Sequence, residues 1–264
     1  MISINPFSEI GTFIPSFVMQ TYVVAMFLLV IGATIFDVIH KKSAKYFFNN
    51  SVKAKKSATR TVGSGEKASL AFKTATNEVL TSSEFCSTRR RLAHLLTMYG
   101  FVLFVIATAV MIFSYSAPNS MTPTIWPLMW HLGAAMLCLG GYWFWFFIRV
   151  DVAAEANSVF RIITADLFVL ALLASATFGL IWSYLQFKEI FIWDTLFLFL
   201  FGVANIALFG GVYWSKFAHM FYKPGAAIQK NLAEADGSRD NLPPPADAPE
   251  QFGLGIKREE PKHY

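Results

Sequence analysis

Five long apolar stretches, separated by shorter polar segments, run through this chain. A helix needs about 20 apolar residues to cross a hydrocarbon core of about 30 Å, and each stretch reaches that length. A β-barrel would show short segments of alternating apolar and polar residues instead. The pattern therefore predicts an all-α fold, a polytopic membrane helix bundle with five transmembrane helices. We expect the spans at residues 14–39, 92–115, 127–148, 162–186 and 194–221.

Most of the charges lie in two polar segments. The first, residues 41–91, joins the first two spans and contains an amphipathic pattern around residues 68–80. The second, residues 223–264, includes the sequence NLPPPADAPE, whose prolines preclude regular structure. We expect a transmembrane domain over residues 1–222 and an extended or disordered tail. That tail either straps a soluble partner to the membrane or has no docking role.

The distribution of Lys and Arg predicts the orientation. Loop 41–91 contains twelve of these residues, whereas the segments on the opposite side contain only Lys188. The positive-inside rule then places the loop and the C-terminal tail in the cytoplasm and the N-terminus outside. The predicted location is the cell inner membrane. Trp126, Trp130 and Trp193 fall where an outer aromatic belt is expected.

The composition excludes several classes of protein. With 55% hydrophobic and 15% charged residues, the chain has too few polar residues to cover a soluble domain. The basic residues flank spans and do not alternate with aromatic residues, which argues against nucleic acid as a partner. Cys86 and Cys138 lie in a loop and in a span, so no disulfide or metal framework is expected. A transporter is disfavoured because the chain lacks internal repeats and has few charges near the midplane.

Three histidines lie within or at the ends of spans, where an ionisable residue suggests a function. His94 lies ten residues from the middle of the second span and His219 eleven residues from the middle of the fifth. These separations correspond to about 15 Å and about 16 Å toward the cytoplasm. His131 lies about 10 Å from the midplane in the other direction. Only His94 and His219 are therefore expected at one depth.

Two imidazoles at one depth on different helices suit the bis-axial ligation of one haem b. The haem propionates would need cations at that level, and several basic residues are available there. They include Arg89, Arg90, Arg91, Arg161 and Lys216. The alternative is that both histidines lie at helix ends and bond to carbonyls or lipid head groups. Gly100 and the Gly210–Gly211 pair either make room for a flat ring or let helices pack closely.

Electron exchange with a quinone would need a proton acceptor beside an apolar slot. His131, with Trp130 beside it, is the candidate at the outer side. Asp166 lies about one turn from the inner end of the fourth span, so it is a candidate near the haem. The alternative for Asp166 is an ion pair with Arg161 or a nearby lysine.

Two motifs resemble a known group of proteins. The sequence RRRLAHLLTMYGFVLF resembles the second helix of respiratory cytochrome b subunits, and SKFAHMFYKPGAA resembles their closing motif. This group includes the gamma subunit of nitrate reductase and the membrane subunits of heterodisulfide-reductase-like and quinone-interacting complexes of sulfur metabolism. Nitrate reductase subunits carry two haems, but this chain lacks histidines around Phe104 and Phe201, where the second pair would lie. This departure from the family favours one haem, and the alternative is the loss of haem altogether.

The sequence thus suggests a membrane anchor and electron-transfer subunit that links a soluble cytoplasmic enzyme to the quinone pool. The chain contains no CxxC cluster, so iron–sulfur and flavin centres would belong to that partner. By analogy with the resembling families, the partner would be an enzyme such as adenylylsulfate reductase. No complete catalytic site is expected in this chain. The alternative function is a haem-free anchor or assembly subunit that only recruits the soluble partner.

Overall fold

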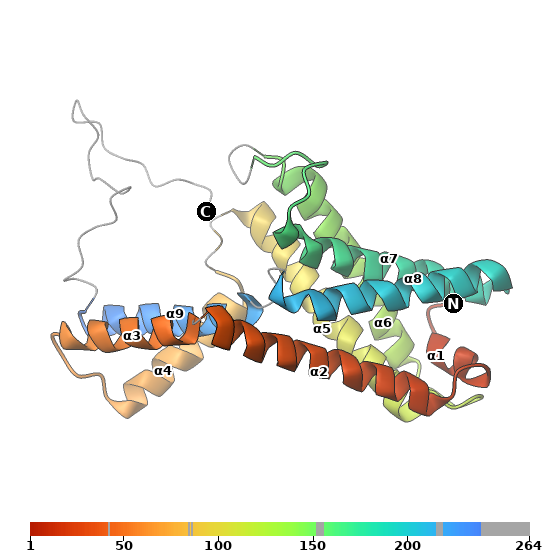
Figure 1. Cartoon of the computed structure of the whole chain (residues 1–264), viewed down its shortest axis with the longest axis horizontal. Helices are drawn as coiled ribbons and strands as arrows, with labels where there is room; N and C mark the ends of the chain where they lie inside the picture. The colour runs from red at the N-terminus through yellow and green to blue at the C-terminus, as the bar shows by residue number, and fades with distance from the viewer. Residues whose placement is uncertain (42, 84, 86, 152–155, 215–218, 239–264) are drawn as a thin grey trace. The chain divides into compact units, whose positions relative to one another are not determined.

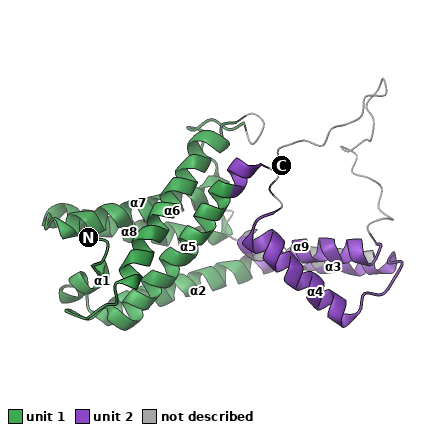
Figure 2. Ribbon diagram, turned by 180° about the vertical axis from the view of Figure 1, so that it is seen from behind, with its two compact units in different colours: residues 1–36, 92–218 green, residues 37–91, 219–264 purple. Residues whose placement is uncertain are grey.

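The computed structural model describes residues 1–41, 43–83, 85, 87–151, 156–214 and 219–238. Within these ranges the secondary structure is helical, and no strand occurs. The chain forms two compact units, which Figure 2 distinguishes by colour. The spanning unit comprises residues 1–36 and 92–218, and the second unit comprises residues 37–91 and 219–264.

Five helices are long and apolar enough to cross a membrane, which confirms the predicted fold class. Large apolar side chains such as Phe17, Leu139 and Phe199 are more than 60% exposed on them, as expected of helices that face lipid. Figure 1 labels these helices. They are α2 (Ser16–Lys41), α5 (Thr88–Tyr115), α6 (Ile125–Trp143, extended to Ile148 by a π-helical turn), α7 (Leu167–Phe187) and α8 (Phe191–Gly210). Of these, α7 and α8 lie side by side over much of their length.

Small residues at intervals of seven bring α5 and α6 together. Ala93 and Ala107 are buried on α5, with Gly100 midway between them. A Cβ on Gly100 would lie 2.8 Å from the carbonyl oxygen of Gly133, and one on Gly140 would lie 2.6 Å from the carbonyl oxygen of Ala93. Neither distance leaves room for a methyl group, so the two backbones touch. Gly100 therefore serves helix packing.

Helix α8 ends before the last residues of the predicted fifth span, of which residues 215–218 lie outside the described part of the chain. Helix α8 stops at Gly210, and a 3₁₀ turn continues only to Tyr213. Gly210 and Gly211 explain this end, because glycine is among the weakest helix formers. A Cβ on either glycine would meet nothing within 4 Å.

A short N-terminal segment is packed onto the spanning unit. Helix α1 (Pro6–Glu9) is capped by Asn5, whose side-chain oxygen accepts a hydrogen bond from the backbone N–H of Phe7. The amide nitrogen of Asn5 donates to the carbonyl oxygen of Tyr115 at 2.9 Å, and that of Gln186 donates to the carbonyl oxygen of Pro6 at 3.1 Å. These bonds fix α1 against the ends of α5 and α7.

The second unit consists of helices α3 (Ser43–Lys56), α4 (Ser64–Thr74, extended to Leu80 by a π-helical turn) and α9 (His219–Ala235). The predicted helix around residues 68–80 is therefore confirmed. Asn231 on α9 donates to Thr74 Oγ1 at 2.7 Å and to Glu78 Oε1 at 2.8 Å. The side chain of Ser51 donates to Gln229 Oε1 at 3.1 Å. Helix α9 thus packs on α3 and α4.

The beginning of the predicted tail differs from the expectation. Residues 223–235 are helical in α9, so the extended conformation predicted from residue 223 onward is wrong for this part. The cause is tertiary, because α9 gains hydrogen bonds and packing from α3 and α4 that a local pattern does not reveal. The proline-rich sequence at 241–250 lies outside the described residues.

Candidate functional site

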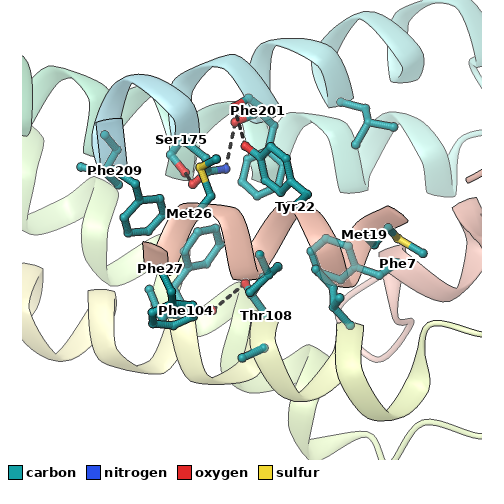
Figure 3. A pocket seen from close by; sticks show the side chains of 18 of the residues that line it. Phe7, Met19, Tyr22, Met26, Phe27, Phe104, Thr108, Ser175, Phe201 and Phe209 are labelled. Atoms are coloured by element: carbon teal, nitrogen blue, oxygen red, sulfur yellow. Dashed lines mark hydrogen bonds between the residues drawn. The ribbon is translucent and has the colours of Figure 1, made fainter. Parts of the chain in front are cut away.

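A cavity of about 250 Å³ lies inside the spanning unit (Figure 3). Its lining comes from the N-terminal segment and from α2, α5, α7 and α8, and consists mainly of Phe, Ile, Val, Leu and Met side chains. The cavity is partly open at the surface of the spanning unit, so a hydrocarbon can enter it from the bilayer.

The polar side chains in the lining are already engaged within the protein. Each donates a hydrogen bond of 2.7–2.9 Å to a backbone carbonyl or to a neighbouring side chain. The pairs are Tyr22 with the Gly202 carbonyl, Thr108 with the Phe104 carbonyl, Ser175 with Asn205 Oδ1, and Asn205 with the Phe201 carbonyl. The cavity therefore presents an apolar surface, which suits a hydrocarbon.

An aromatic cluster forms one wall of the cavity. Phe7, Phe104 and Phe201 line the cavity, and all three rings also contact Trp130, with centroid distances of 6.0, 5.1 and 6.4 Å. Trp182 stacks on Phe201 at 5.8 Å. Such edge-to-face and stacked pairs hold the rings in fixed orientations. The wall is therefore rigid.

Trp130 differs from its expected place in an outer aromatic belt. Its side chain is fully buried, and its indole N–H donates to Thr108 Oγ1 on α5 at 2.9 Å. A belt tryptophan would present its ring to the membrane interface. The expectation was wrong because depth along a span does not reveal which side of a helix faces the bundle.

His131 is buried beside Trp130 and joins α6 to α7. Its Nδ1 lies 2.7 Å from the carbonyl oxygen of Pro127, and its Nε2 lies 2.8 Å from Ser183 Oγ. Because a carbonyl oxygen only accepts, Nδ1 carries a hydrogen. In the neutral ring, Ser183 then donates to Nε2. Neither His131 nor Trp130 is among the residues that line the cavity, and a quinone at His131 would have to displace or share Ser183.

Asp166 is paired with Arg149. The Arg149 guanidinium is 1% exposed, and its Nη2 donates to Asp166 Oδ2 at 2.5 Å. The same Nη2 donates to the Arg161 carbonyl oxygen at 2.5 Å, and Nη1 donates to that of Ser158 at 2.6 Å. Arg149 also lies 4.2 Å from the centre of a Trp145 ring. Arg149 thus ties the connection between α6 and α7 to the start of α7.

The sequence left open an ion pair between Asp166 and Arg161 or a lysine. In the structure the partner is Arg149, and Arg161 contributes its backbone carbonyl. Asp166 Oδ2 also accepts a hydrogen bond from the backbone N–H of Ile163 at 3.0 Å. A role of Asp166 at a quinone stays a prediction, and it would have to coexist with these bonds.

The predicted haem ligands lie in different units. His94 belongs to the spanning unit, where its side chain is exposed on α5, and His219 opens α9 in the second unit. The side chain of His219 and all of Lys216 lie outside the described residues. The pairing of the two histidines therefore stays a prediction.

The arginines before His94 occupy the first turn of α5. Arg91 Nε donates to the Thr81 carbonyl oxygen at 2.7 Å, and the Arg90 guanidinium lies 5.8 Å from the centre of the Phe85 ring. Arg89 is exposed in the same turn, and Arg161 is exposed in the connection between α6 and α7. A haem propionate would find positive charge in this turn of α5.

Comparisons with protein-family models, with curated proteins and with solved structures give no match for this chain. The fold and the cavity define a class: a multi-pass α-helical membrane protein with an apolar cavity in its spanning unit and a separate helical unit.

Sequence reasoning missed Ser183 and the cavity. A serine in an apolar span gives no signal until its partner on another helix is known. The cavity depends on how α2, α5, α7 and α8 are spaced, which single-sequence periodicity does not specify. The lining positions of α2, such as Met19, Val23 and Met26, recur at helical spacing, as on any helix face that packs inside a bundle.

Proposed function

We propose that this protein is the membrane anchor and electron-transfer subunit of an oxidoreductase complex. It links a soluble cytoplasmic enzyme with iron–sulfur and flavin centres, of the adenylylsulfate reductase kind, to the quinone pool of the inner membrane. One haem b, held by His94 and His219, connects the two. The observation that supports this proposal best is the division of the chain into an apolar spanning unit with a hydrocarbon-lined cavity and a basic helical unit.

The basic helical unit supports the anchoring role. Lysines occupy the exposed surfaces of α3 and α4, whereas the acidic residues of these two helices and their connection are few. The exposed lysines are Lys45, Lys53, Lys55, Lys56, Lys67 and Lys73. A positive surface of this kind attracts an acidic patch on a protein partner and orients its approach. The interaction would weaken with ionic strength, because exposed charges are screened by salt.

The haem assignment is supported by the position of His94. Its imidazole is exposed on α5, three residues after Arg91, so a bound ring would have cations nearby. His94 and His219 would supply the axial nitrogens, and Arg89, Arg90 and Arg91 would neutralise the propionates. When bound, the haem would supply one-electron transfer between the soluble partner and the quinone.

A reduced-minus-oxidised absorption spectrum of the purified protein tests the haem. We expect a low-spin α-band that is lost in His94→Ala and in His219→Ala, because one remaining imidazole holds the iron weakly. His40→Ala is the matched control, since His40 is also exposed in the flank of a span, and it should keep the band. His131→Ala should keep the band as well.

A wild-type spectrum without haem would refute the electron-transfer part of the proposal. The haem-free anchor would then be the better interpretation, because the basic unit requires no cofactor to recruit a partner. Its own test is co-purification of soluble subunits with the full-length protein. Replacing Lys53, Lys55 and Lys56 by Gln should release those subunits at lower salt than wild type, and unchanged retention would contradict docking on α3.

A further inference from the structure

The lining of the cavity extends along three helices of the spanning unit. Its lining follows α2 from Val18 to Phe27, and on both α5 and α8 it covers eleven residue steps. At about 1.5 Å per residue, these stretches correspond to a length of about 15 Å. A hydrocarbon chain that lies along the helices can contact the lining over this length.

The lining of the cavity is chemically suited to a hydrocarbon chain. The four polar side chains direct their hydrogen bonds to groups of the protein, and the rest of the lining is apolar. An apolar cavity of about 150 Å³ holds one benzene molecule. By the same scale, a cavity of about 250 Å³ holds about ten carbons. Two isoprene units contain that number of carbons.

We propose that this cavity binds the isoprenoid tail of a quinone, with room for about two isoprene units. The inference deepens the proposed function and rests on it, since it names the part of the substrate that the spanning unit recognises. The cavity is a site for the tail, and the reactive head group would lie beyond its end.

The rigid aromatic wall favours an isoprenoid over a lipid acyl chain. Phe7, Phe104 and Phe201 are held from behind by Trp130, so the shape of the cavity is fixed on that side. An isoprene unit contains a rigid double bond, so it loses less conformational freedom in a fixed cavity than a saturated chain does. In a bilayer both chains leave an equally apolar environment, so packing and this entropy decide between them.

Two glycines provide a matched pair of variants. Gly202 on α8 lines the cavity, whereas Gly32 on α2 does not, and a Cβ on either would meet nothing within 4 Å. Gly202→Leu therefore adds a side chain at the cavity without a clash at Cβ. Gly32→Leu adds the same side chain to a span elsewhere. Ala109→Phe is a second variant that narrows the cavity from α5.

The test uses the full-length protein in lipid nanodiscs and the quenching of its tryptophan fluorescence by quinones. Three probes share one benzoquinone ring and carry two isoprene units, a decyl chain or a methyl group. We expect the isoprenoid probe to bind about tenfold more tightly than either of the others, which corresponds to about 1.4 kcal/mol. Gly202→Leu and Ala109→Phe should abolish this preference, and Gly32→Leu should keep it.

Three outcomes would overturn the proposal. The first is equal binding of the decyl or methyl probe to wild type. The second is a preference that survives in both cavity variants. The third is a phospholipid that stays bound to the purified protein, as detected by mass spectrometry, and that the isoprenoid probe does not displace. Because the assay measures binding alone, a protein that shows the preference but lacks haem or a soluble partner would refute only the proposed function.

Discussion

Replacing Asp166 with Asn tests the buried ion pair at the junction of α6 and α7. The substitution keeps the shape of the side chain but removes the charge that faces Arg149, which is 1% exposed. Removing one partner of a buried pair typically costs about 3–5 kcal/mol, because the remaining charge stays buried without compensation. Arg149 keeps its bonds to two backbone carbonyls and its contact with Trp145. We therefore expect a loss of about 3 kcal/mol, at the lower end of that range.

Reversible unfolding in mixed detergent micelles measures this free energy. Arg161→Gln is the control, because Arg161 enters the network only through its backbone carbonyl, and its exposed side chain should contribute less than about 0.5 kcal/mol. The double variant Arg149→Met with Asp166→Leu should recover much of the loss, since an apolar pair leaves no buried charge. Wild-type stability in Asp166→Asn would refute the assignment of Asp166 to a structural pair, and its role at a quinone would regain support.

Two further predictions concern contacts inside each of the two units. Gly133→Ala should destabilise the spanning unit by about 3 kcal/mol or more, because its Cβ would lie 2.7 Å from the backbone nitrogen of Phe104; Gly32→Ala should be nearly neutral in the same unfolding assay. Arg60 lowers the pKa of Glu66, so their pair should stabilise the second unit above the ordinary carboxylate pKa and cease to do so as the pH falls through the lowered value. Limited proteolysis at a series of pH values measures this effect, and cleavage within residues 57–66 should increase at acid pH in the wild type. Glu66→Gln should remove this pH dependence, and an unchanged pH profile in the variant would contradict the prediction.

The five spans could be predicted from sequence because their signal is local. Length and apolar composition alone decide whether a helix crosses a bilayer, and loops cannot replace helices in the hydrocarbon core. In the fifth span, helix α8 ends at Gly210 although the apolar pattern continues past it. The glycine pair was visible in the sequence. Its weak helix propensity outweighed the hydrophobicity of the residues that follow.

The second unit could be predicted only in part. The helix around residues 68–80 has a pattern of its own, whereas α3 and α9 are short and polar, and such helices depend on packing. Lys53, Lys55 and Lys56 in the last turn of α3 favour its C-terminal end. The contact between α9 and α4 joins residues that are more than 150 positions apart, such as Asn231 and Thr74. No single-sequence pattern encodes such a pairing.

For the candidate site, the sequence predicts the depth of a side chain in the membrane but not its direction. Counting residues along a span gives the depth of His94 or His131, but it does not tell which way a side chain points. His131 proved to face Ser183 inside the bundle, while the side chain of His94 is exposed. An imidazole with both nitrogens engaged in the protein serves packing first, so His131 belongs to the helix contact between α6 and α7. The ligand role of His94 stays a prediction, because exposure on α5 shows where its side chain points and not what it binds.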